Sequence, residues 1–153
     1  APLPGTEALR HFLASTFAAS ALLVELPVRT DGPGTIRMIG SRLDSLALFV
    51  PGPVLPDDGP RADAGARLAA LARAAQAAAA PATLEIDAPG EAVEAGGPGV
   101  LLRVVALPFA AAAPGVQPVL VIASWRHLLS PEETAALHEE LRSAVCALRR
   151  LGD

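Results

Sequence analysis

The chain has 153 residues, of which 52% are hydrophobic and 3% aromatic, and this length is enough to bury one domain core. The formal net charge is −4, and so few aromatic rings on an acidic chain argue against binding to nucleic acid or to an anionic membrane. All twelve basic residues are Arg, which excludes a Schiff-base lysine and a P-loop lysine.

The cysteine count and the hydropathy of the chain indicate in which cellular compartment it is expected. The single cysteine, Cys146, excludes an internal disulfide and a cysteine-based zinc site. It is compatible with a reducing cytosol, and we expect a cytoplasmic protein. No apolar run reaches the roughly 18 residues of a membrane span, and residues 18–26 are too short, and lack the basic flank, for a signal peptide. The sequence begins at Ala1, which is compatible with a fragment or a processed form of a longer protein.

The N-terminal part predicts an amphipathic helix followed by a β-hairpin. Apolar residues at helical spacing predict a helix over residues 6–18. The alternation of residues 20–28 predicts a strand, and turn-forming residues separate it from a second strand over 35–39. We expect Ile36 and Met38 to share one face of that second strand.

Helices are predicted between the second and third strands. A capping box at Ser41 starts a short helix that we expect to run through Phe49. Several proline and glycine residues then make 50–61 a loop. The alanine-rich stretch from 63 to 80 predicts a helix, which Pro81 ends.

Three more strands are predicted in the second half. Residues 83–88 alternate like a half-buried strand, and its outer face carries Glu85 and Asp87, as is typical of an edge strand. Two β-branched apolar runs, 100–109 and 119–125, predict an antiparallel hairpin, which is the most apolar part of the chain.

The last element is a strongly signalled helix over residues 130–151. Ser130 is an N-cap, Pro131 occupies the first helical position, and Glu133 completes a capping box. Apolar residues then repeat at alternating spacings of four and three, which forms a seam that can dock on a sheet or on a twin helix. The seam consists of Leu137, Leu141, Ala144, Leu148 and Leu151.

These elements predict an α+β domain with a five-stranded antiparallel sheet. A helical insert separates strands two and three, and amphipathic helices flank the sheet at both ends of the chain. We expect one domain over 1–153, with an N-terminal helix at 6–18, a core at 20–126 and a C-terminal helix at 130–151.

The order of elements is that of a PAS domain, and one stretch adds a resemblance in sequence. Residues 35–46 read Thr-Ile-Arg-Met-Ile-Gly-Ser-Arg-Leu-Asp-Ser-Leu. This resembles a short family of bacterial PAS-like proteins, in which a strand of alternating Arg and apolar residues runs into Gly-Thr or Gly-Ser before a helix. Residues 22–34 and 120–125 are similar to that family's first and last strands. The resemblance covers about residues 17–125 and implies a sensory or protein-interaction module, without naming a cofactor.

A PAS-type cavity would lie between the inner sheet face and the helical insert. Its lining would include Leu43, Leu102 and Val104, although the same residues could simply form a filled core. Arg37 and Arg103 interrupt apolar strands, so each either faces solvent or points into the pocket to bind a carboxylate. The candidate ligand-binding residues are Met38, Arg42 at the pocket mouth, Leu46, Phe49, Leu68, Leu71 and Arg103.

No catalytic residue, metal site, haem site or flavin site is indicated. His11, His127 and His138 lack the spacing of a metal site, and the residue four positions after His138 is Arg142. Cys146 is interpreted as a small apolar filler. The serines lie outside any nucleophile-elbow motif.

The first functional hypothesis is a noncatalytic sensory or regulatory module that signals through its terminal helices to an output domain or a signalling protein. We expect a homodimer, through the first helix, the last helix or both. One alternative is a hot-dog-like thioesterase, which would need a carboxylate from Asp57, Asp58 or Asp63 and would be disfavoured by a helical insert lying on one sheet face. The other is an interaction adaptor with a filled core and no ligand.

Overall fold

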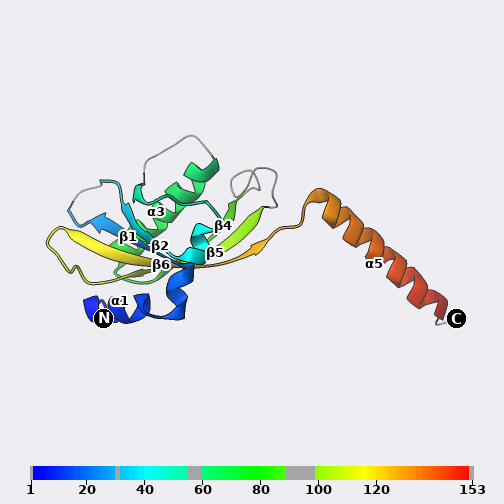
Figure 1. Cartoon of the computed structure of the whole chain (residues 1–153), viewed down its shortest axis with the longest axis horizontal. Coiled ribbons are helices and arrows are strands. Elements are labelled where there is room, and N and C mark those ends of the chain that lie inside the picture. The colour runs from blue at the N-terminus through cyan, green and yellow to red at the C-terminus, as the bar shows by residue number, and fades with distance from the viewer. Residues whose placement is uncertain (1, 30–31, 55–59, 89–98, 152–153) are drawn as a thin grey trace.

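The computed structural model describes residues 2–29, 32–54, 60–88 and 99–151, and these form an antiparallel sheet with helices on both faces (Figure 1). The final helix extends away from the sheet. The elements in chain order are α1 (Thr6–Leu13), the 3₁₀ helix η1 (Thr16–Ser20), β1 (Ala21–Pro27), β2 (Thr35–Ile39), α2 (Ser41–Asp44), β3 (Gly52–Pro53), α3 (Pro60–Ala78), β4 (Ala82–Ala88), β5 (Val100–Pro108), β6 (Val116–His127) and α5 (Pro131–Leu151).

The sheet has six strands in the order β3-β2-β1-β6-β5-β4, so the expectation of five strands was wrong. All neighbouring pairs are antiparallel. The additional strand, β3, consists of Gly52 and Pro53 and pairs with the start of β2. It lies in the stretch that the sequence predicts as a loop. A strand of two residues is too short to show the alternation of apolar and polar residues from which a strand is predicted.

The predicted helices at 6–18 and 41–49 are both shorter than expected. The first ends at Leu13, and the chain continues as η1. The second, α2, ends at Asp44, and Ala47 adopts a left-handed conformation with φ of 53°. A residue in that conformation interrupts a right-handed helix.

Gly40, between β2 and α2, allows these segments to pack closely together. A Cβ atom at Gly40 would overlap the backbone of Ala18 and Ala19 in η1. The Gly40 N–H also donates to the carbonyl of Ala21 at 2.7 Å. The junction between β2 and α2 therefore packs directly on the segment that leads from α1 into β1, and only glycine leaves room for it.

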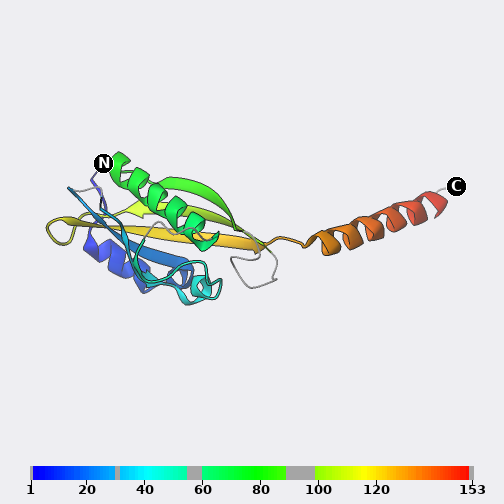
Figure 2. The same cartoon turned by 90° about the horizontal axis from the view of Figure 1, so that it is seen from above.

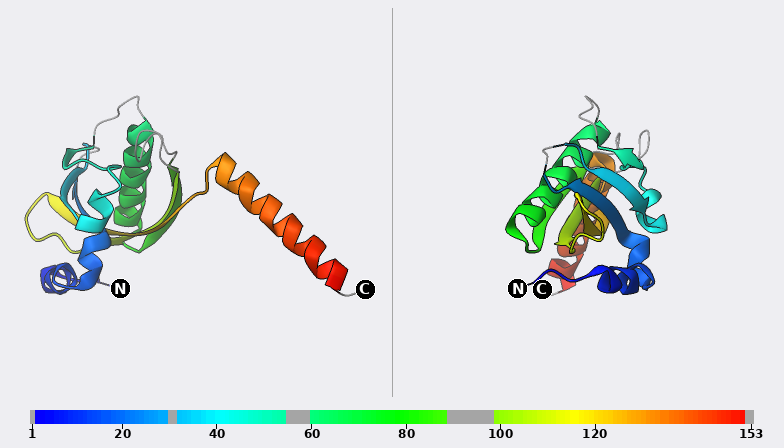
Figure 3. Two further views of the ribbon diagram at one scale, coloured as in Figure 1. Left: turned by 45° about the vertical axis from the view of Figure 1, so that its right-hand side comes forward. Right: turned by 90° about the vertical axis from the view of Figure 1, so that its left-hand side faces the viewer.

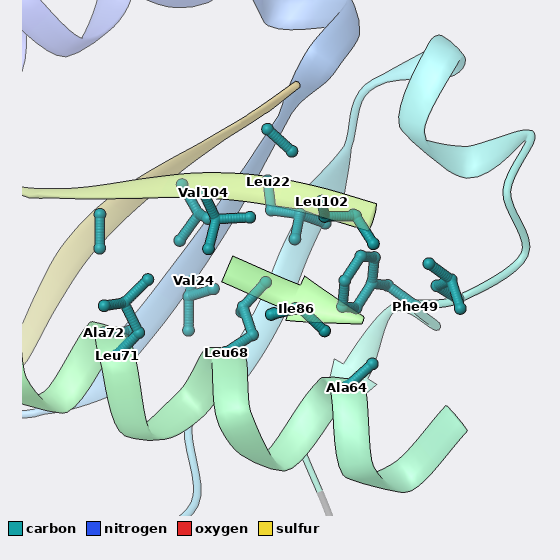
Figure 4. Packing of buried hydrophobic residues seen from close by; sticks show 14 of the residues in the cluster. Leu22, Val24, Phe49, Ala64, Leu68, Leu71, Ala72, Ile86, Leu102 and Val104 are labelled. Carbon is teal, nitrogen blue, oxygen red and sulfur yellow. The ribbon is translucent and has the colours of Figure 1, made fainter. Parts of the chain in front are cut away.

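Helix α3 covers one face of the sheet, and α1 covers part of the other (Figures 1 and 2). Alternate residues of β1, β5 and β6 point to the two faces, as the period of two requires. The larger core cluster packs α3 against the inward residues, and Figure 4 shows Leu68 and Leu71 among them. The smaller cluster joins Leu9 of α1 to Ala21, Leu120 and Phe109.

Both edges of the sheet are protected against pairing with another strand. At the β4 edge, Arg67 of α3 donates from Nη2 to the carbonyl of Glu85 at 2.9 Å. Acidic Glu85 and Asp87 are also exposed there. The opposite edge is the two-residue β3, in which Pro53 has no N–H to donate. Short edges, charges and proline are devices that discourage edge-to-edge association.

We predict that Gly40→Ala destabilises the fold by about 3 kcal/mol or more, because backbone rather than a mobile side chain occupies the space of the new methyl group. Gly65→Ala is the control: its Cβ would meet only Val54 at 3.9 Å, and alanine in a helix gains up to about 1 kcal/mol over glycine. Urea unfolding of both variants measures the difference. Equal stabilities would show that this junction tolerates a side chain.

Candidate functional site

The apolar residues of the predicted ligand site come together between α3 and the sheet. Leu46, Phe49, Leu68 and Leu71 belong to one cluster and are no more than 7% exposed. Figure 4 shows the last three of them. No described side chain has a buried polar atom without a hydrogen-bond partner. The arrangement thus offers contacts for an apolar ligand but, among the described residues, no unpartnered buried polar side chain to orient one.

Met38 departs from this group because of a β-bulge. Leu23 of β1 faces Met38, but the next residue, Val24, faces Ile36, so Arg37 is the additional residue on β2. The expectation that Ile36 and Met38 share a face was therefore wrong. Ile36 joins the α3-side core, while Met38 lies opposite Leu23, which packs on the α1 side.

The arginines of the two strands lie outside the core rather than pointing into it. Arg37 pairs through Nε with Glu25 at 2.6 Å, and its side chain is 60% exposed. Arg103 pairs through Nε with Glu85 at 2.8 Å and is 70% exposed. The interpretation of these residues as solvent-facing holds, and neither can bind a carboxylate inside the core. Such exposed pairs contribute about 0–1 kcal/mol.

Arg42 makes a contact that the sequence pattern does not reveal. Its guanidinium lies over the ring of Trp125, with Cζ 5.5 Å from the ring centroid. Trp125 is half-buried and packs against the α3-side core. This contact therefore joins α2 to the C-terminal end of β6, close to the point where the chain leaves the sheet. A cation–π contact of this kind contributes about 0.5–1 kcal/mol at an exposed site.

A shallow groove lies beside this contact, with a volume of about 200 Å³. It is lined by Leu101, Arg103, Ser124, Trp125 and Arg126. Register places Arg103 opposite both Glu85 and Ser124, so this part of the outer sheet face is largely polar. A solvated face of this kind is typical of antiparallel sheets, and we assign it no ligand.

The exit from β6 into α5 is well defined. The Leu128 N–H donates to the Gly99 carbonyl at 2.7 Å, which extends the pairing of β6 with β5. The predicted capping box is then present in both directions: the N–H of Ser130 donates to Glu133 Oε2 at 2.8 Å, and the N–H of Glu133 donates to Ser130 Oγ at 3.1 Å. The start of α5 is thus fixed by local hydrogen bonds.

The apolar stripe of α5 is uncovered. Leu137, Leu141, Val145 and Leu148 are between 44% and 68% exposed, and α5 points away from the sheet and its helices (Figure 3). Val145 extends the predicted seam, since it stands eight residues after Leu137 and so lies on the same face. Leu151 belongs to α5, but its side chain lies outside the described residues.

The remaining candidate residues from the sequence do not form a site among the described residues. His11, His127, His138 and Cys146 are all exposed, so the interpretation of Cys146 as an apolar filler was wrong. It was wrong because α5 is not packed on the domain. Within the ranges given above, no three His, Cys, Asp or Glu residues are grouped to hold a metal ion, and no helix is long and apolar enough to cross a membrane. The predicted carboxylates Asp57 and Asp58, and the side chain of Asp63, lie outside the described residues.

Comparison with known proteins adds no assignment: no family model matches the chain, and no curated protein matches it.

We predict that Arg42→Ala shifts the fluorescence emission of Trp125, the one tryptophan of the chain, and lowers stability by about 0.5–1 kcal/mol. The physical reason is that the indole ring loses the guanidinium that lies over it. Arg37→Ala is the matched control, because its exposed ion pair with Glu25 involves no aromatic ring. An emission spectrum unchanged in both variants would contradict the stacking.

Proposed function

We propose that the chain is a noncatalytic, PAS-like sensory or regulatory module that acts as a homodimer through α5. The observation that carries this proposal is the uncovered apolar stripe of α5, on a helix that continues directly from an inner strand of the sheet. Four large apolar side chains on one exposed helix face are unusual for a monomer and typical of an interaction surface.

The arrangement of strands supports the PAS-like part of the proposal. Strands β1 and β2 precede α3, and β4, β5 and β6 follow it, which is the order that the resemblance implies. The sixth strand, β3, adds only two residues at one edge. The position of α3 across one face of the sheet argues against the thioesterase alternative.

The route from the core to α5 supports a signalling role. Val119, Val121 and Ala123 of β6 belong to the α3-side core, and Trp125 follows them on the same strand. A change in how α3 packs on these side chains would shift the end of β6 and thus the start of α5. Packed interfaces of this kind switch between discrete arrangements rather than deform continuously. An output domain or a signalling protein would then read the position of α5.

The core composition limits what the input could be. Because the described part of this cluster is apolar, we propose that any ligand between α3 and the sheet is itself apolar. The close packing of Leu68, Ala72 and Ala75, each 0% exposed, equally favours the second candidate, a ligand-free interaction adaptor. Native mass spectrometry of the purified protein separates the two, because only a sensor would carry or acquire a bound small molecule.

Dimerisation through α5 predicts a concentration-dependent monomer–dimer equilibrium. Leu141→Asp combined with Leu148→Asp should raise the dissociation constant at least about 100-fold, because each copy would then bury carboxylates in place of leucines. Analytical ultracentrifugation over a wide concentration range measures this.

The matched control is Ser143→Asp, which adds a charge on the same helix but outside the apolar stripe. It should dimerise like the unmodified chain. A monomer at every concentration, or equal dissociation constants for all variants, would refute dimerisation through this stripe. The cytoplasmic location and the identity of the output partner stay predictions.

A further inference from the structure

We propose that Arg73 and Gln76 form a latch that holds the C-terminal part of α3, residues 72–78, against the sheet, and that this part opens as a local unit when the latch is released. The latch consists of these two side chains and of the backbone carbonyls of Pro27 and Gly32, at the connection between β1 and β2. Its use as a route for an input rests on the proposed function, whereas the latch itself involves no residue of α5.

The composition of α3 changes after Leu71. Of the seven residues 72–78, five are alanine, and the other two are Arg73 and Gln76. In the preceding turns, the larger side chains of Leu68 and Leu71 anchor the helix in the core (Figure 4). A buried alanine contributes only one methyl group. The C-terminal part of α3 is therefore held by few apolar contacts, and its polar contacts matter more.

The two polar side chains bind the same carbonyl group. Arg73 Nη1 donates to the Pro27 carbonyl at 3.1 Å, and Gln76 Nε2 donates to the same oxygen at 3.3 Å. Arg73 Nη1 also donates to Gln76 Oε1 at 3.1 Å, and Nη2 donates to the Gly32 carbonyl. These hydrogen bonds are partly buried, where water screens them less than at an exposed site. They form one connected network between α3 and the end of β1.

The latch also connects to the start of β6. Val28, the residue after Pro27, donates its N–H to the Gly115 carbonyl at 2.9 Å. Gly115 directly precedes β6, so consecutive contacts join α3, the end of β1 and the start of β6. Helix α3 also packs in the same core cluster as β6. In the proposed function, an input that releases the latch would loosen that packing.

The C-terminal end of α3 is tied closely to the sheet by the chain itself. Only residues 79–81 separate it from β4. Release of the latch should therefore unwind the last turns of α3 without carrying the whole helix away. Amide hydrogen exchange detects an opening of this kind when its free energy lies below that of global unfolding.

Hydrogen exchange of Arg73→Ala and Gln76→Ala, followed by NMR in the full chain, tests the latch. Alanine is the best helix former, so both substitutions would slow exchange in α3 if helix propensity alone decided it. Loss of the latch predicts the opposite. Exchange of residues 72–78 should become at least about tenfold faster in Arg73→Ala, because hydrogen bonds from a charged donor are lost. The increase should be smaller in Gln76→Ala, which removes a neutral donor.

Arg67→Ala is the matched control. Arg67 lies on the same helix and donates one hydrogen bond to the Glu85 carbonyl, but it precedes the segment that opens. Its loss affects the closed helix and the locally open helix alike. Exchange of residues 72–78 should therefore stay within about twofold of that in the unmodified chain.

Urea separates local opening from global unfolding. The exchange of residues 72–78 should rise less steeply with urea than that of β5 and β6, because a local opening exposes less surface. Equal dependence on urea would overturn the local unit. Unchanged or slower exchange of residues 72–78 in both Arg73→Ala and Gln76→Ala, or equal acceleration in Arg67→Ala, would overturn the latch. Gln76→Ala alone decides the matter if Arg73→Ala does not fold. These results do not depend on dimerisation, which ultracentrifugation tests separately.

Discussion

Strand β6 is the constraint on which the other elements depend. It is twelve residues long, pairs with β1 on one side and β5 on the other, and alternates its side chains between both core clusters. Helix α3 packs against one set of these side chains, and α1 packs against the other. Strand β6 therefore has neighbouring strands on both sides and helices over both faces, and α5 follows it in the chain.

The C-terminal end of β6 connects the sheet to the exposed helix α5. Trp125 packs on the core and carries the guanidinium of Arg42, while the Leu128 N–H prolongs the pairing with β5. The capping box at Ser130 then starts α5 three residues after the end of β6. In the proposed function, a change in core packing would reach the start of α5 through these contacts, and a second copy would cover the exposed stripe of that helix.

Much of this fold could be predicted from the sequence, because long periodic segments specify their own structure. The hairpin of β5 and β6, helix α3 and the capped start of α5 lie where alternation, alanine content and the capping box place them. Three features could not be predicted in this way: the bulge at Arg37, strand β3 and the early end of α2. They depend on single backbone conformations or on pairing between strands, and the hydrophobic periodicity of the sequence contains no sign of either. Within the candidate site, Leu46, Phe49, Leu68 and Leu71 cluster as expected, but Met38 departs from them and Arg103 lies outside the core. The contact of Arg42 with Trp125 joins residues 83 positions apart, and only the folded chain brings them together.

The proposed homodimer requires that a second copy covers the apolar stripe of α5 in solution. Hydrogen exchange of the α5 amides, measured at increasing protein concentration, tests it most directly, because an isolated helix of this length opens readily in water. If two copies pair along α5, the exchange of its amides slows markedly as concentration rises, while the exchange of β5 and β6 stays constant. Fast exchange of α5 at every concentration would contradict it.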